Sequence, residues 1–222
     1  MTRGKAVVAS YMGVLAYAGF IFLAAGKFRY RQGIIYVITA LAGATLTHAL
    51  ERGNSNLSVD RVTMAGAGQL WDKRILGTLF LASLITFVVA GLDSGRFGWS
   101  EPMPAWMTIA GVSLMVGGQC LFAVSRRVNR YFSSTVRIQS GHAVCDQGPY
   151  RFIRHPGYLG MLISILAFPL LINSYWAFIP ASVAAILLIV RTVWEDNVLA
   201  DALPEYKGYA LRTRWKLVPG IL

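Results

Sequence analysis

Five long stretches of this sequence contain no lysine, arginine, aspartate or glutamate, and they restrict the possible folds more than any other feature. A helix needs about 20 apolar residues to cross a lipid bilayer. The first four stretches have that length, although the third is near the lower limit. With 55% hydrophobic and 14% charged residues, the chain is predicted to span a membrane. The stretches are residues 6–26, 32–50, 75–92, 102–125 and 156–190.

The fifth stretch has 35 residues, which is too long for a single membrane-spanning helix. The pair Asn173-Ser174 lies at its middle, just after Pro169, and predicts a turn between two short helices. We therefore expect an all-α polytopic membrane helix bundle of about six helices. Residues 1–125 would hold about four of them, and residues 126–222 would form a C-terminal core with a helical hairpin over 156–194 and a cytoplasmic tail.

The positive charge is distributed as in a membrane protein. If the N-terminus lies in the cytoplasm and the segment from Ala6 is a retained helix, the inside segments carry 17 of the 21 lysines and arginines. We therefore expect the formal charge of +11 to contact membrane lipids. We expect no nucleic-acid partner. Lys27, Arg29 and Arg31 would face outside, against this bias, so the topology of the first helical hairpin stays open.

A polar turn, residues 148–160, precedes the fifth stretch and concentrates ring nitrogens, hydroxyls and guanidinium groups. Pro156 suits the first turn of a helix, and such a helix start binds anions. At the other end of the hairpin, Arg191 and Glu195 are four residues apart and share a helical face. The hairpin should make His155 and Glu195 neighbours. These groups either bind a zwitterionic ligand or only solvate the helix end, and both interpretations are equally supported.

Other signatures of chemistry are missing from the sequence. It has no P-loop, no GxGxxG after a strand, no HExxH, no Cys/His cluster at metal spacing and no nucleophile elbow, so we expect no metal site. The run from Trp71 to Arg74 is interpreted as an interface anchor with its charges in water, Asp72 included; a site role for Asp72 is the less favoured alternative. The basic run from Arg126 to Arg130 is interpreted as contacting lipid headgroups, with recognition of an anionic substrate headgroup as the less favoured alternative.

The combined pattern resembles a known family. Residues 148–160 read Gly-Pro-Tyr-Arg-Phe-Ile-Arg-His-Pro-Gly-Tyr-Leu-Gly, and residues 191–196 read Arg-Thr-Val-Trp-Glu-Asp. With the paired tyrosines of the tail, this is similar to the isoprenylcysteine carboxyl methyltransferase family, a group of integral-membrane methyltransferases with phospholipid methyltransferases among its relatives. The resemblance covers roughly residues 130–222, with weaker support from Trp71-Asp72-Lys73.

The resemblance implies a cofactor, S-adenosyl-L-methionine, in a pocket at the cytoplasmic face. An upstream polar contact would fall at Arg137 or Gln139. Leu203-Pro204 replaces the usual Phe-Gly pair of the tail, so Tyr206 and Tyr209 either cover the cofactor or pack. The implied cofactor-binding residues are Gln139, His142, Ala143, Val144, Cys145, Tyr150, His155, Pro156, Gly157, Tyr158, Glu195, Tyr206 and Tyr209.

The implied reaction is carboxyl O-methylation of a lipophilic or prenylcysteine-like substrate that partitions into the membrane. The implied catalytic residues are Arg191, which would also bind the substrate carboxylate, and Glu195. A phospholipid amine as acceptor would need a base, Glu195 or His155. An NAD(P)H-dependent lipid reductase and a non-catalytic membrane protein are the other readings. The short chain suggests a prokaryotic inner-membrane protein; the acceptor and the oligomeric state stay open.

Overall fold

The computed structural model describes residues 3–51 and 68–222, and the regular elements in these ranges are helical. The predicted polar loop between the second and third helices falls mostly outside the described residues. The elements are α1 (Arg3–Ala25), α2 (Arg31–Leu50), α4 (Leu70–Ala90), the π-helix η2 (Gly91–Phe97), α5 (Ala105–Val128), the 3-10 helix η3 (Gly148–Arg151), α6 (Pro156–Ile172), α7 (Phe178–Ala202) and α8 (Pro204–Arg212).

Five of the described helices are long and apolar enough to cross a membrane, namely α1, α2, α4 with η2, α5 and α7. The expected all-α polytopic bundle is confirmed, and the chain is a multi-pass membrane protein. The shorter apolar helix α6 is joined to α7 by the predicted turn, where Asn173 has a φ of 61°. The second arm of this hairpin is longer than expected, because α7 has 25 residues and continues to Ala202.

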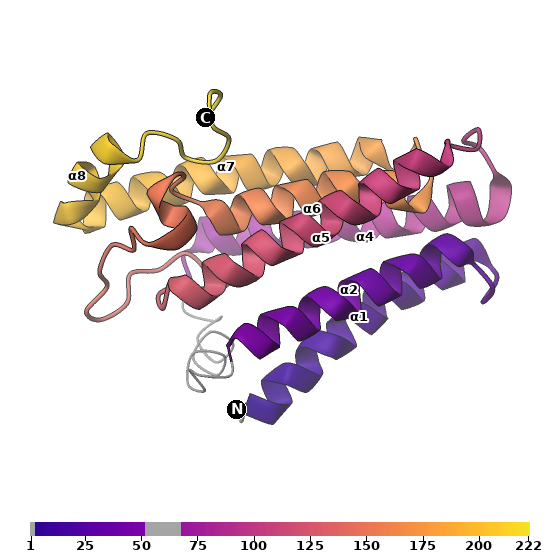
Figure 1. Cartoon of the computed structure of the whole chain (residues 1–222), viewed down its shortest axis with the longest axis horizontal. Helices are drawn as coiled ribbons and strands as arrows, with labels where there is room; N and C mark the ends of the chain where they lie inside the picture. The colour runs from indigo at the N-terminus through magenta and orange to yellow at the C-terminus, as the bar shows by residue number, and fades with distance from the viewer. Residues whose placement is uncertain (1–2, 52–67) are drawn as a thin grey trace.

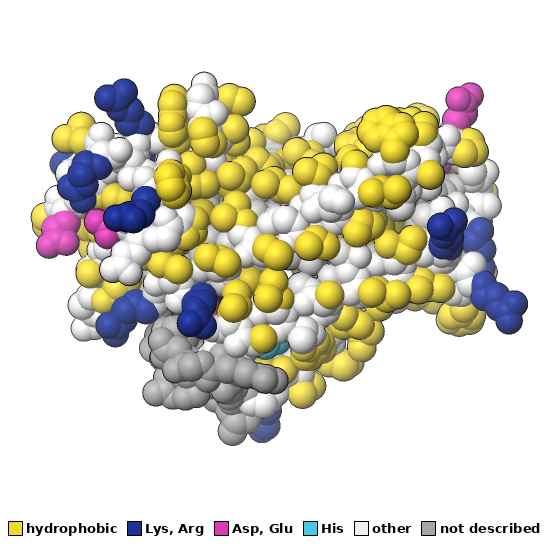
Figure 2. Space-filling view, viewed as in Figure 1, with side chains coloured by type: hydrophobic (Ala, Val, Ile, Leu, Met, Phe, Trp, Pro, Cys, Tyr) yellow, Lys and Arg dark blue, Asp and Glu magenta, His cyan; other side chains and the backbone are white. Residues whose placement is uncertain are grey.

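The helices run along the long axis of the molecule, with α1 and α2 packed beside the group formed by α4 to α7 (Figure 1). The segment between α5 and α6 lies at the same end as α8, and residues 26–30 lie at the opposite end (Figure 1). Charged side chains gather toward the two ends on the face shown in Figure 2, and its middle is apolar. This pattern is the one expected for a protein that crosses a bilayer.

Helices α5 and α6 approach each other closely because glycines face each other across their contact. A Cβ atom at Gly118 would lie 2.5 Å from the carbonyl oxygen of Gly160 and 2.6 Å from Oγ of Ser164. Small residues allow this close packing of helices in a membrane. The contact fixes the start of α6, and therefore the polar turn before it, against the end of α5.

We expect Gly118→Ala to destabilise the protein by about 1–3 kcal/mol, because the added methyl group must push the two helices apart. Gly117→Ala is a matched control, since a Cβ at the neighbouring Gly117 meets nothing within 4 Å. Thermal unfolding in detergent would measure both variants. Equal melting temperatures for the two would show that the α5–α6 contact is not tight.

The C-terminal tail is bound to the polar turn through backbone hydrogen bonds. The amide of Arg154 donates to the carbonyl of Trp215 at 2.9 Å, and the amide of His155 donates to the carbonyl of Lys216 at 2.9 Å. The tail therefore lies beside residues 153–155 and holds the end of the turn where α6 begins.

Candidate active site

A polar pocket lies at the α8 end of the bundle. Its space is about 720 Å³, part of it open to solvent. The walls come from the segment between α5 and α6, the start of α6, the last turns of α7 and the helix α8. The lining residues are Asn129, Tyr131, Phe132, Ser133, Thr135, Val136, Arg137, His142, Ala143, Val144, Cys145, Tyr150, Arg154, His155, Gly157, Tyr158, Glu195, Leu199, Leu203, Tyr206 and Tyr209.

Most residues that the resemblance assigned to the cofactor line this one pocket. They are His142, Ala143, Val144, Cys145, Tyr150, His155, Gly157, Tyr158, Glu195, Tyr206 and Tyr209. Pro156, Gln139 and Arg191 are not among the lining residues. The amide of Gln139 donates to the carbonyl of Tyr131 at 2.8 Å, whereas Arg137 lines the pocket. Of the two upstream candidates, Arg137 is therefore the one with access to the pocket.

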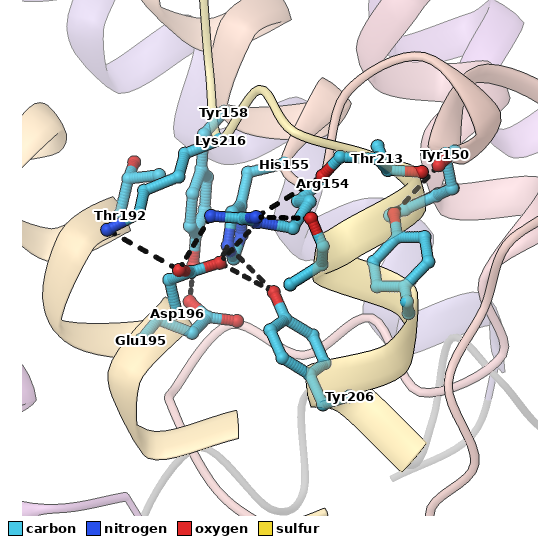
Figure 3. Close-up of polar contacts among 12 residues, drawn as sticks. Tyr150, Arg154, His155, Tyr158, Thr192, Glu195, Asp196, Tyr206, Thr213 and Lys216 are labelled. Atoms are coloured by element: carbon cyan, nitrogen blue, oxygen red, sulfur yellow. Dashed lines mark hydrogen bonds and ion pairs between the residues drawn. The ribbon is translucent and has the colours of Figure 1, made fainter. Parts of the chain in front are cut away.

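Asp196, which is 5% exposed, is the centre of a buried polar cluster beside the pocket (Figure 3). Its carboxylate accepts hydrogen bonds from Nε and an Nη of Arg154 at 2.9 and 3.0 Å and from the Tyr206 hydroxyl at 2.7 Å. Nε2 of His155 lies 3.2 Å away, and Nζ of Lys216 lies 3.5 Å away. The Asp196 cluster, these five residues, thus joins the polar turn, α7, α8 and the tail.

Both tyrosines of α8 are held in place by hydrogen bonds. Burial and the Asp196 carboxylate raise the pKa of Tyr206, so its hydroxyl stays protonated and can donate. The hydroxyl of Tyr209 donates to the carbonyl of Tyr150 at 2.7 Å, and burial raises the pKa of both phenols. The two α8 tyrosines also line the pocket. Each of them therefore both packs inside the protein and forms part of the pocket wall.

Glu195 presents a carboxylate to the pocket. The Tyr158 hydroxyl donates to this carboxylate, and the Tyr158 ring lies parallel to the His155 ring with 5.7 Å between their centroids. The ends of the hairpin meet as expected, but His155 pairs with Asp196 instead of Glu195. Successive residues of a helix point about 100° apart, so Glu195 and Asp196 face different partners.

Arg191 lies behind Tyr158 and is 3% exposed. Its guanidinium carbon is 5.1 Å from the centroid of the Tyr158 ring, and its Nε donates to the Asp72 carboxylate at 2.7 Å. Asp72 is fully buried, so the prediction that its charge lies in water was wrong. The sequence signal was present: an acidic residue in the first turn of a membrane helix is costly there unless it has a partner.

Three buried polar atoms of pocket residues have no hydrogen-bond partner among the described residues: Oγ1 of Thr135, Nε of Arg137 and Nδ1 of His142. The His142 ring stacks on Tyr131 with 4.5 Å between centroids, and burial lowers the pKa of His142, which favours the neutral ring. Buried polar groups in proteins are nearly always hydrogen-bonded. These three atoms can therefore form hydrogen bonds with a polar group that enters the pocket.

The sequence analysis assigned no role to several residues that shape the site, among them Thr135, Arg154 and Asp196. Arg154 and Asp196 belong to the two quoted motifs, but their pairing joins residues 42 positions apart in the chain. Thr135 lies in a segment without helical periodicity, so no pattern distinguishes it from its neighbours. Among the described residues, no group of three or more His, Cys, Asp or Glu is placed to hold a metal ion.

The comparisons with known proteins agree with the resemblance. Residues 109–201 match the model of the isoprenylcysteine carboxyl methyltransferase (ICMT) family. The cobalt-zinc-cadmium resistance protein CzcN of Cupriavidus metallidurans is 31% identical over 139 residues, 59% of this chain and 58% of that protein. The uncharacterized protein YpbQ of Bacillus subtilis is 30% identical over 102 residues, 46% of this chain and 60% of that protein. The chain thus spans about three fifths of each relative's length.

Proposed function

We propose, from the ICMT family match of residues 109–201 and the polar pocket that they largely form, that this multi-pass membrane protein is an S-adenosylmethionine-dependent methyltransferase. The observation that carries the proposal is the set of buried polar atoms of Thr135, Arg137 and His142 in that pocket, for which the described residues supply no hydrogen-bond partner. They lie in the matched region and face the same space as the Glu195 carboxylate.

The chemistry of the pocket suits this cofactor. S-adenosylmethionine carries a carboxylate, an ammonium, a sulfonium, ribose hydroxyls and an adenine ring. Arg137 and Thr135 are donors suited to the carboxylate or the hydroxyls, and Glu195 is an acceptor suited to the cationic groups. The cofactor supplies an activated methyl group when it is bound.

The work left to the protein is to align the acceptor and keep water away from it. A lipophilic acceptor would enter from the membrane, with its reacting group near Tyr158 and Glu195. A carboxylate acceptor is already ionised at neutral pH and needs no base. Direct binding of that carboxylate to Arg191, as the resemblance implied, would have to use donors other than Nε, which binds Asp72, and Arg191 does not line the pocket.

A phospholipid amine is the second acceptor class that we consider. The observation in its favour is that Glu195 offers a carboxylate to the pocket while the charge of Arg191 is balanced by Asp72. An amine must lose a proton before it can accept a methyl group, and Glu195 could take up that proton. Carboxyl O-methylation of a prenylcysteine-like or other lipophilic carboxylate remains the first proposal, because it is the reaction in the family's name.

We also propose that the pocket faces the cytoplasm of a prokaryotic cell, with the protein in the inner membrane. Most of the described lysines and arginines lie at the α8 end of the bundle, which is the end of the pocket. Cytoplasmic loops of membrane proteins carry this excess of positive charge. Cysteine-accessibility labelling at the α8 end, in intact and opened cells, would test the orientation.

Calorimetric titration of the detergent-purified protein tests the cofactor. We expect S-adenosylhomocysteine to bind and NADPH not to bind. Binding of NADPH alone would replace the proposal with a lipid reductase, and binding of neither would favour a non-catalytic protein.

The acceptor class can then be assigned with S-adenosylmethionine labelled in its methyl group. The two probes are N-acetyl-S-farnesylcysteine, a lipophilic carboxylate, and phosphatidylethanolamine, a lipid amine, each in mixed micelles. Methyl esters release volatile methanol in alkali, whereas N-methyl groups do not. Label that alkali releases from the first probe supports O-methylation, and alkali-stable label in the second supports the amine.

A further inference from the structure

We propose that Asp72, on α4 and outside the region that matches the family, is a positioning residue for the polar pocket. It acts through Val136 and Arg191, which it binds, and the inference rests on the proposed cofactor function. The buried pair Asp72–Arg191 holds one wall of the pocket in the conformation that receives the ligand.

The side chains of Asp72 and Arg191 form hydrogen bonds with the backbone at both ends of the short segment 134–136. One carboxylate oxygen of Asp72 accepts the backbone N–H of Val136 at 2.7 Å, and the other accepts Nε of Arg191 at 2.7 Å. Nη2 of Arg191 donates to the carbonyl of Ser134 at 2.9 Å. Residues 134–136 belong to no helix or strand, so these contacts replace the hydrogen bonds of regular structure.

Thr135 lies between Ser134 and Val136, whose backbone groups bind Arg191 and Asp72. It is 5% exposed, lines the pocket and has an unpartnered Oγ1. Gly68, just before α4, packs directly against it, since a Cβ at Gly68 would lie 2.6 Å from Cβ of Thr135. The start of α4 therefore sets the position of Thr135 both by contact and through the hydrogen bonds of Asp72.

The pair also supports the opposite wall. Arg191 lies against the face of the Tyr158 ring, and the Tyr158 hydroxyl donates to Glu195. A guanidinium against an aromatic face is an attractive contact that depends on orientation. Because Asp72 fixes the direction of the guanidinium, it influences the Glu195 carboxylate through Arg191 and Tyr158.

An uncharged amide cannot replace the Asp72 carboxylate. Both carboxylate oxygens accept hydrogen bonds, from Val136 and from Arg191, whereas an asparagine has a single acceptor oxygen and would turn its NH₂ group toward a donor. It would also leave Arg191 charged, buried and without the carboxylate to which it is hydrogen-bonded. In the Asp72→Asn variant, residues 134–136 should therefore lose their fixed position.

The test combines titration with S-adenosylhomocysteine and thermal unfolding of the purified full chain. We expect Asp72→Asn to weaken binding by about tenfold to a hundredfold, as expected for the loss of hydrogen bonds to charged groups. Glu51→Gln is the matched control, because Glu51 is 2% exposed, pairs with Arg126 at 3.0 Å and does not line the pocket. The control should lose stability but keep the wild-type affinity.

The outcomes separate this inference from the proposed function. If the wild type does not bind S-adenosylhomocysteine, the proposed function fails and the role of Asp72 fails with it. If the wild type binds and Asp72→Asn binds equally well, the positioning role alone is overturned. Equal loss of affinity in Asp72→Asn and Glu51→Gln would also overturn it, because the effect would then be one of general stability.

A second variant covers the case in which Asp72→Asn does not fold. Replacing a buried ion pair by apolar side chains is often neutral for stability. The double variant Asp72→Leu/Arg191→Leu should therefore fold, yet bind S-adenosylhomocysteine at least tenfold more weakly than the wild type. Hydrogen exchange of the Val136 amide should also be faster in it. Wild-type affinity in the double variant would refute the proposal.

Discussion

Asp196→Asn should reduce the stability of the protein by about 3–5 kcal/mol. The variant keeps the size of the side chain but removes the charge that balances Arg154, which is only 8% exposed. An asparagine also has one acceptor oxygen fewer than the carboxylate to which Tyr206 and His155 are bonded. Because these groups join α6, α7 and α8, the loss should loosen the whole α8 end. Thermal unfolding in detergent should show a melting temperature lower by about 10 °C.

The control is Asp201→Asn, a change of the same chemistry near the end of the same helix. Asp201 is exposed, so the free energy of unfolding of its variant should lie within about 0.5 kcal/mol of the wild-type value. If Asp196→Asn were as stable as Asp201→Asn, the buried Asp196 cluster would not hold the site together. The pocket walls would then be held by the other contacts described above, such as the Tyr209–Tyr150 hydrogen bond and the backbone bonds of the tail.

Glu195→Gln should raise the dissociation constant for S-adenosylhomocysteine by about tenfold to a hundredfold. The amide keeps the shape of the side chain and can still accept from Tyr158. It loses the negative charge that we assign to the cationic end of the cofactor, and charge-assisted hydrogen bonds are about twice as strong as neutral ones. Calorimetric titration at constant pH measures the change directly.

Glu205→Gln, at the exposed start of α8, is the control for the loss of one negative charge near the site. It should bind S-adenosylhomocysteine as the wild type does, because Glu205 does not line the pocket. Unchanged affinity in Glu195→Gln would remove Glu195 from the cofactor site and leave it as a group for the acceptor. Both variants should melt near the wild-type temperature, since Glu195 is not fully buried.

The membrane bundle could be predicted from the sequence because its signal is local. A stretch without charges and of spanning length implies a helix whatever its neighbours are, so the bounds of α1, α2 and α5 lie close to the predicted ones. The turn at Asn173 was predicted for the same reason: a 35-residue apolar run cannot cross once. The end of α7 was harder to predict, because the helix leaves its apolar stretch and continues into a charged segment.

Two pairings at the site needed the tertiary structure. The sequence placed Asp72 in water and predicted only that His155 and Glu195 are neighbours, whereas the folded chain pairs Asp72 with Arg191 and His155 with Asp196. Asp72 and Arg191 are 119 positions apart. No periodicity or motif links residues at that distance, and a helix rotation of about 100° per residue decides whether Glu195 or Asp196 meets a given partner.

The sequence by itself thus determined a helical membrane bundle with a polar, motif-bearing segment at one end, because hydrophobicity and spacing act along the chain. Only the tertiary structure decided which charges neutralise each other and which polar atoms of Thr135, Arg137 and His142 have no partner among the described residues. The physical reason is that a buried charge or donor takes the partner that packing brings within about 3 Å. That partner is chosen by the arrangement of helices, which no short stretch of sequence contains.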